Sequence, residues 1–125
     1  METGLILFAH GARDPRWTAP FDAVAACVRA AQPDLPVRLA FLELMTPTLP
    51  EAGAELVALG CRHLHVLPMF LGAGGHVRRD LPLLVQVLRT HHPALEVTVL
   101  PAVGEIDSVA AAMAQAALRL VREAA

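Results

Sequence analysis

Short apolar runs alternate with longer amphipathic stretches along the whole chain. Four of the runs have the length of strands and cover residues 4–10, 37–43, 63–70 and 96–102. Each run is followed by a stretch in which apolar residues recur every three or four positions, which is typical of a helix with one buried face. The pattern therefore predicts four strands alternating with four helices, without a linker or low-complexity segment.

Polar and special residues mark the ends of the predicted helices. Thr48 and Glu51 have the spacing of a capping box at the start of the second helix. Asp80 is predicted to cap the third helix, which should run to about His92 because Pro93 follows. The last helix is expected to pack on the sheet through an inner face made of Ile106, Val109, Met113, Leu120 and Val121.

This alternation predicts one α/β domain over residues 1–125. Strands that are apolar on both faces are typical of a parallel sheet covered by helices on each side. Right-handed crossovers then favour the doubly wound, flavodoxin-like strand order 2-1-3-4. The length of 125 residues agrees with a single core.

Composition and charge narrow the function classes. Hydrophobic residues make up 55% of the chain, which is ample for a core on both faces of the sheet. The net charge is −2, which gives no electrostatic reason to expect nucleic acid or an acidic membrane as a partner. No apolar run reaches the length of a membrane span, and the N-terminus lacks the basic region of a signal peptide. We therefore expect a cytoplasmic protein, in which Cys27 and Cys61 are buried free thiols.

Three polar side chains are expected to meet at one edge of this sheet. His10 ends the first strand, Glu43 ends the second, and His76 follows the third on a glycine-rich segment whose glycines could aim it back over the first strand. Ligands of open parallel sheets bind beyond the carboxyl ends of the strands, where the strand order reverses. Two histidines and a carboxylate form a common ligand set for cobalt, nickel, iron or zinc.

Each of these residues also has a purely structural interpretation. His10 alone could be a satisfied turn residue, and Glu43 alone a solvated strand end. Their predicted convergence on one edge favours a functional site. His63 and His65 share one face of the third strand but lie at its amino end, so we expect a structural or surface role for them.

The segments "ILFAHGARDPRW", "AFLELMTPTLPEA" and "LPMFLGAGGHVRRDLP" resemble the small, single-domain sirohydrochlorin chelatases of the class II chelatase superfamily. The likeness runs in order along essentially the whole chain. It implies a chelatase-like half domain that inserts Co²⁺, Fe²⁺ or Ni²⁺ into sirohydrochlorin, in cobalamin or sirohaem-type tetrapyrrole biosynthesis. One departure is visible, because Ala12 stands where the family usually has a serine.

The resemblance also assigns roles to individual residues. It implies that His10 and His76 bind the metal and are catalytic, and that Glu43 assists at the metal. Neutral imidazoles, with an ordinary pKa of about 6.5, can hold a metal weakly and accept the two pyrrole protons. The metal is then a substrate, and no permanently bound cofactor is expected. The expected substrate-binding residues are Arg13, Gly74, Gly75, Arg78 and Arg79, the arginines facing the carboxylates of the macrocycle.

The resemblance leads to one further expectation, and two rival functions were weighed against it. The large chelatases contain two such domains, so a one-domain chain is expected to form a homodimer. A histidine phosphatase would need an arginine immediately before His10, where this chain has Ala9. A non-catalytic carrier of metal or tetrapyrrole could use the same residues, and this alternative stays open.

Overall fold

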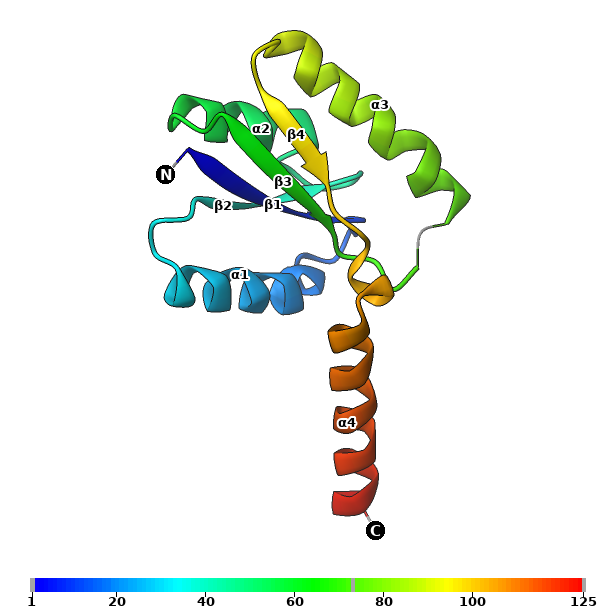
Figure 1. Ribbon diagram of the computed structural model, residues 1–125. Coiled ribbons are helices and arrows are strands. Elements are labelled where there is room, and N and C mark those ends of the chain that lie inside the picture. Colours follow the sequence, from blue (N-terminus) through cyan, green and yellow to red (C-terminus); the bar gives the residue numbers. More distant parts are fainter. Residues whose placement is uncertain (1, 73, 125) are drawn as a thin grey trace.

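The computed structural model describes residues 2–72 and 74–124, and of His76 the backbone only. Its centre is a four-stranded, fully parallel sheet in the order β2-β1-β3-β4 (Figure 1). The strands are β1 (Thr3–Ala9), β2 (Val37–Phe41), β3 (His63–Pro68) and β4 (Glu96–Val99). The α/β class and the predicted strand order are therefore confirmed. Each strand ends one to three residues before the predicted boundary, so His10 and Glu43 lie in loops beyond the strands.

Helices follow each strand as predicted. They are α1 (Ala19–Ala31), α2 (Leu49–Ala58), α3 (Gly75–His91) and α4 (Asp107–Ala124), and short 3₁₀ turns, η1 (Pro15–Thr18) and η2 (Val103–Glu105), precede α1 and α4. Helix α1 lies along one face of the sheet, whereas α2 and α3 cover the other (Figure 1). The predicted capping box is present at α2, where Glu51 N–H donates to Thr48 Oγ1 and Thr48 N–H to Glu51 Oε1.

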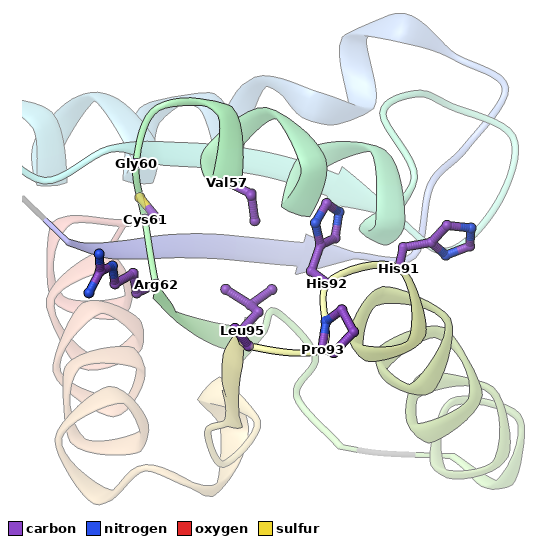
Figure 2. Close-up of a pocket in the computed structure, with 9 residues that line it drawn as sticks. Val57, Gly60, Cys61, Arg62, His91, His92, Pro93 and Leu95 are labelled. Carbon is purple, nitrogen blue, oxygen red and sulfur yellow. The ribbon is translucent and has the colours of Figure 1, made fainter.

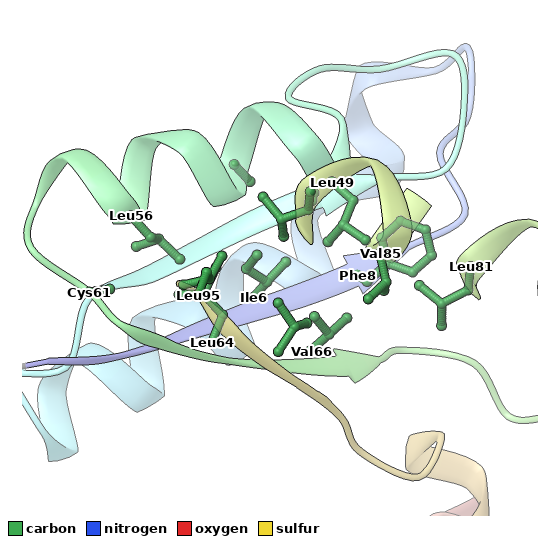
Figure 3. Close-up of a cluster of buried hydrophobic side chains, with 14 of the residues drawn as sticks. Ile6, Phe8, Leu49, Leu56, Cys61, Leu64, Val66, Leu81, Val85 and Leu95 are labelled. Carbon is green, nitrogen blue, oxygen red and sulfur yellow. The ribbon is translucent and has the colours of Figure 1, made fainter. Parts of the chain in front are cut away.

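The face under α2 and α3 carries the main core (Figure 3). Ile6 and Phe8 of β1 and Val66 of β3 are fully buried there against leucines of both helices. The two helices approach each other at Gly53, where an added Cβ would lie 2.4 Å from Leu88 Cδ1. This tight packing makes the sheet and these two helices a rigid support for the loops at the strand ends.

The opposite face is covered only in part. Helix α1 packs on β1 and β2 through a smaller cluster around Leu7, Ala25 and Val37. On the β3 side of that cluster, Leu67 and Met69 are only half-buried. The prediction that helices cover both faces of the sheet is thus correct for α1 and incomplete for the β3–β4 half.

Helix α4 is the helix that was expected to cover this half of the sheet. It extends away from the sheet instead, and none of its residues is buried (Figure 1). The side chains of Met113, Leu120 and Val121, predicted to form its inner face, are exposed by 43%, 58% and 68%. That prediction is wrong for this chain on its own, because apolar periodicity identifies the face of a helix that seeks cover but not the surface that covers it.

Helix α3 begins five residues before the predicted cap. Gly74 occupies the N-cap position and Asp80 lies in the second turn, so the prediction that Asp80 caps this helix is wrong. The helix continues through Pro82, which cannot donate a backbone hydrogen bond. The sequence Asp-Leu-Pro resembles a helix start. The prediction therefore missed the turn of α3 that precedes it and begins at Gly75.

Two expectations from composition have different outcomes. Cys61 is buried, but Cys27 is exposed, so only one of the two thiols is in the core. Within residues 2–72 and 74–124, no helix combines the length and the apolar character that crossing a membrane requires.

Candidate functional site

His10 and Glu43 meet at the carboxyl edge of the sheet. His10 Nε2 lies 3.0 Å from Glu43 Oε1, although the residues are 33 positions apart in the chain. Their loops are held together because the backbone ladder between β1 and β2 continues past both strands, with Glu43 N–H donating to His10 O over 3.1 Å. Both side chains are about half exposed, by 45% and 47%, so a ligand can reach them.

Gly11 makes this approach possible. Its φ of +96° is in the left-handed region, and an added Cβ would lie 1.8 Å from the carbonyl oxygen of Glu43. Leu44, directly after Glu43, also has a positive φ of 65°, which is strained for a leucine. The residue that follows each member of the pair thus has a left-handed backbone, and conformational strain of this kind is typical of functional sites.

Phe70 is a site residue that the sequence reasoning missed. Its ring meets the His10 imidazole edge to face at 6.3 Å and packs against Phe8 in the core at 6.1 Å. Phe70 therefore connects His10 to the rigid centre of the domain. The only hint in the sequence was an aromatic residue at the end of the predicted third strand, residues 63–70.

His76 lies in the first turn of α3, and its side chain is outside the described residues. The expectation that it sits on a loop shaped by glycines is wrong, because α3 already begins at Gly75. Gly72, Gly74 and Gly75 have no positive φ, and a Cβ at any of them would meet open space. The glycine with a left-handed backbone near the site is instead Gly11, which directly follows His10.

The predicted arginines lie around the same edge of the sheet. Arg13, Arg78 and Arg79 are all exposed, Arg13 in the loop after β1 and the other two in the first turns of α3. Arg78 also lines a groove of about 500 Å³ whose walls include Val77 and Leu81 of α3 and the residues that follow β4. An apolar groove edged by a cation suits a ring system that carries carboxylates.

Among the described side chains, no three of His, Cys, Asp and Glu come close enough together to hold a metal ion. His10 and Glu43 supply two ligands with suitable spacing. At metal–ligand distances of about 2.1 Å, neighbouring ligands of an octahedral ion lie roughly 3.0 Å apart. The observed separation of Nε2 and Oε1 is 3.0 Å, which matches this spacing, and the imidazole would have to turn so that its Nε2 lone pair faces the ion.

The opposite edge of the sheet also has a hollow, of about 620 Å³, between the end of α2 and the turn after α3 (Figure 2). Cys61, His91 and His92 contribute to its wall. Burial raises the pKa of the Cys61 thiol, which keeps it protonated and a poor ligand or nucleophile. His91 Nδ1 lies 2.9 Å from the carbonyl of Val87 within its own helix.

His63 and His65 lie at this amino edge, as predicted. Their rings stack at 4.3 Å, and His63 Nε2 is 2.7 Å from Thr98 Oγ1 of the adjacent β4. They are thus engaged with each other and with the neighbouring strand. His63 Nδ1 also lies 3.8 Å from Glu96 Oε2, a longer distance than the 3.0 Å between His10 Nε2 and Glu43 Oε1.

Comparison with known proteins places the chain in a family. The family model CbiX matches residues 4–120. The chain belongs to the CbiX family. Relatives in this family carry the name sirohydrochlorin cobaltochelatase: the one from Methanothermobacter thermautotrophicus is 35% identical over 79 residues, which are 63% of this chain and 54% of that protein. The one from Methanococcoides burtonii is 29% identical over 84 residues, 67% of this chain and 64% of that protein. The chain thus matches between half and two thirds of the length of these relatives.

Solved structures agree with the CbiX assignment. A CbiX protein from Marinobacter aquaeolei VT8 is 25% identical and superposes with a TM-score of 0.85, covering 97% of this chain and 98% of that one. The sirohydrochlorin chelatase SirB from Bacillus subtilis subspecies spizizenii, solved in complex with cobalt, is 21% identical and superposes with a TM-score of 0.74. It aligns with 82% of this chain but only 44% of its own length, and at this identity the likeness concerns the fold alone.

Proposed function

We propose that this CbiX-family protein is a metal chelatase that inserts a divalent metal into sirohydrochlorin, with Co²⁺ as the first candidate and Fe²⁺ or Ni²⁺ as alternatives. The names of the relatives support the reaction and the tetrapyrrole. The observation that carries the proposal is the His10–Glu43 pair, whose two facing atoms have the separation of adjacent ligands on a metal ion. His76 follows β3 at the same edge, in the first turn of α3, and is the proposed third ligand.

The reaction exchanges protons for metal. Two pyrrole N–H protons leave the macrocycle as the ion enters, and a base must accept them. In the metal-free protein, a proton on His10 Nε2 can be donated to Glu43 Oε1. Binding of the ion needs the Nε2 lone pair, so a proton on that nitrogen must move to Nδ1 or leave the ring. Once the ion moves into the macrocycle, the imidazoles of His10 and of His76, the proposed third ligand, can each take up one of the two pyrrole protons.

The substrate is proposed to lie across the carboxyl edge of the sheet. Arg13, Arg78 and Arg79 are exposed around it and would pair with the peripheral carboxylates. Gly74 and Gly75 carry no side chain at the start of α3, so the macrocycle could approach the backbone there. We further propose a cytoplasmic homodimer, since this chain corresponds to less than half of the SirB chain that it resembles in fold.

A spectrophotometric insertion assay tests the proposal. Sirohydrochlorin is mixed with Co²⁺, Ni²⁺ or Fe²⁺ with and without the protein, and metallation is followed by the change in absorbance. A chelatase accelerates at least one insertion at catalytic protein concentrations. Binding of metal or macrocycle without any acceleration would instead indicate a carrier that uses the same residues, and would overturn the proposed activity.

A further inference from the structure

Leu44 combines two features that cost a folded chain stability. Its φ of 65° makes it the one residue other than glycine with a positive φ in the part of the chain that the structure describes. It is also 58% exposed. An exposed leucine is common on protein surfaces, but a leucine with a left-handed backbone is rare and strained. Because Leu44 directly follows the site residue Glu43, this strain points to a function for its side chain.

The loop around Leu44 is tightly held. Met45 N–H donates to the carbonyl of Glu43 over 2.8 Å, which closes a three-residue γ-turn with Leu44 at its centre. At the base of the loop, Phe41 N–H donates to the carbonyl of Pro47 over 2.9 Å. The turn therefore fixes the backbone of Leu44 beside Glu43 and leaves an apolar side chain open to solvent at the edge of the site.

A second exposed leucine has the matching position on the other side of the site. Leu71 is 70% exposed and lies three residues after the end of β3, just as Leu44 lies three residues after the end of β2. The loop of Leu71 is also held, because Gly104 N–H donates to the carbonyl of Phe70 over 3.0 Å. Neighbouring strands are about 4.8 Å apart, so the ends of β2 and β3 lie roughly 10 Å apart, with β1 and His10 between them.

We propose, as an inference that rests on the proposed function, that Leu44 and Leu71 are substrate-contact residues that hold the apolar ring of the tetrapyrrole over the His10–Glu43 pair. The proposed arginine contacts concern the carboxylates at the edge of the macrocycle, whereas its flat ring needs apolar partners. Phe70 already packs against the core, so the two exposed leucines supply the apolar surface that a ligand can reach. The left-handed turn keeps Leu44 at the site, and its strain is the cost of that placement.

Binding of metal-free sirohydrochlorin, followed by its fluorescence, tests this role. Leu44→Gly removes the side chain and adopts a positive φ without strain. We expect its dissociation constant for the macrocycle to rise about five- to tenfold, because the exposed part of the leucine no longer becomes buried on binding. Leu44→Met keeps an apolar side chain and should stay within about twofold of wild type. Leu71→Ala should raise the constant about three- to fivefold.

Leu59→Gly is the matched control. Leu59 is also 58% exposed, but it lies at the C-cap of α2 and has an ordinary φ of −80°. Its replacement should leave the affinity for the macrocycle within about twofold and lower the urea midpoint of unfolding, because glycine adds freedom to the unfolded chain. Leu44→Gly should instead raise this midpoint by roughly a few tenths of a molar, since the relief of strain exceeds that cost. A gain in stability together with a loss of affinity is the result expected for a residue that is strained in order to bind.

Three outcomes would overturn the proposal. If Leu44→Gly bound the macrocycle as tightly as wild type, Leu44 would not contact it. If the variant lost affinity for Co²⁺ alone to the same extent as for the macrocycle, Leu44 would act by positioning Glu43. If it weakened self-association in sedimentation and left the affinity for the macrocycle unchanged, Leu44 would belong to an interface between copies.

Failure of the proposed function gives a different result. A wild type that binds sirohydrochlorin but accelerates no insertion is a carrier, and the same titrations of Leu44→Gly and Leu59→Gly then still decide whether Leu44 contacts the ring. A wild type that binds no sirohydrochlorin would overturn both the proposed function and this contact.

Discussion

The carboxyl and amino edges of the sheet are built from similar parts and differ in what those parts face. Each edge has a histidine whose Nε2 approaches an oxygen of the neighbouring segment, Glu43 for His10 and Thr98 for His63. Each also has a glycine with φ near +100°, at Gly11 and Gly60. His10 lies beyond the end of its strand, however, whereas His63 lies on its strand and bonds across to β4.

This difference is the reason that we propose the carboxyl edge as the ligand site. In the sheet, β1 lies between β2 and β3, so the strand order reverses beside it. The connections that follow β1 and β3 lead to helices on opposite faces of the sheet, α1 and α3, which leaves a crevice between the two strand ends (Figure 1). At the amino edge, His63 and His65 share one face of β3, and their rings contact each other at 4.3 Å with a tilt of 32°. A similar set of residues therefore contacts the sheet at the amino edge, whereas at the carboxyl edge we propose that it takes part in chemistry.

The largest expected contrast is between His10→Ala and His63→Ala. Replacing His10 removes a proposed ligand and a proposed base together, so insertion of Co²⁺ into sirohydrochlorin should fall to the uncatalysed rate. That loss exceeds the ~10²–10⁴-fold that acid–base help alone usually contributes. His76→Ala should behave in the same way. His63→Ala should keep nearly the full rate in the same assay, and an equal loss in all three variants would remove the distinction between the edges.

Glu43→Gln should have the next largest effect. The substitution keeps the size of the side chain but removes the charge that faces His10 Nε2 and the proposed metal. We expect kcat to fall about 10²-fold, with the unfolding midpoint little changed, because the pair is half exposed. Glu55→Gln is the control. Glu55 Oε2 accepts from Arg38 Nε over 3.1 Å, and this pair is not part of the proposed site. An unchanged kcat in Glu43→Gln would leave His10 without a working carboxylate partner.

The two left-handed glycines permit a comparison of stability. Both Gly11→Ala and Gly60→Ala force a positive φ on an alanine, which costs about 1–2 kcal/mol. Only at Gly11 does the new Cβ meet the Glu43 carbonyl oxygen, at 1.8 Å, whereas at Gly60 nothing lies within 4 Å. Urea unfolding should therefore show that Gly11→Ala loses roughly 2 kcal/mol more than Gly60→Ala. Equal losses would mean that the loop at His10 yields without cost.

Hydrophobic pattern was enough to predict the sheet, and the reasons are physical. A strand buried on both faces needs a continuous apolar run, so the strands and their order could be read from the chain. The positions of His10 and Glu43 then follow from topology, because both end adjacent parallel strands. The contact between them depends on Gly11, whose left-handed backbone leaves no periodic trace in the sequence.

The elements that were predicted wrongly share another cause. Asp80 and the inner face of α4 were assigned from local signals whose meaning depends on tertiary surroundings. A helix that already runs through Pro82 turns a typical cap into an interior residue. An apolar stripe is equally apolar whether its own sheet or a second copy covers it. Local patterns identify such surfaces, and only the spatial arrangement identifies their partners.

The smallest expected effects concern the arginines. Arg13→Ala, Arg78→Ala and Arg79→Ala should each raise KM for sirohydrochlorin by about three- to tenfold and leave kcat nearly unchanged, because exposed charge pairs contribute roughly 0.2–1 kcal/mol each and somewhat more when bidentate. Arg78 should have the largest effect of the three, since it alone also lines the apolar groove beside α3.

Salt separates this role from a structural one. An interaction between exposed charges is screened as ionic strength rises, so the KM difference between wild type and each arginine variant should shrink between low salt and about 0.5 M salt. Arg62→Ala is the matched control, since Arg62 is an exposed arginine at the amino edge and should change KM at neither ionic strength. If Arg62→Ala raised KM as much as Arg78→Ala, the general charge of the protein would attract the substrate, and the carboxyl edge would have no special claim on its carboxylates.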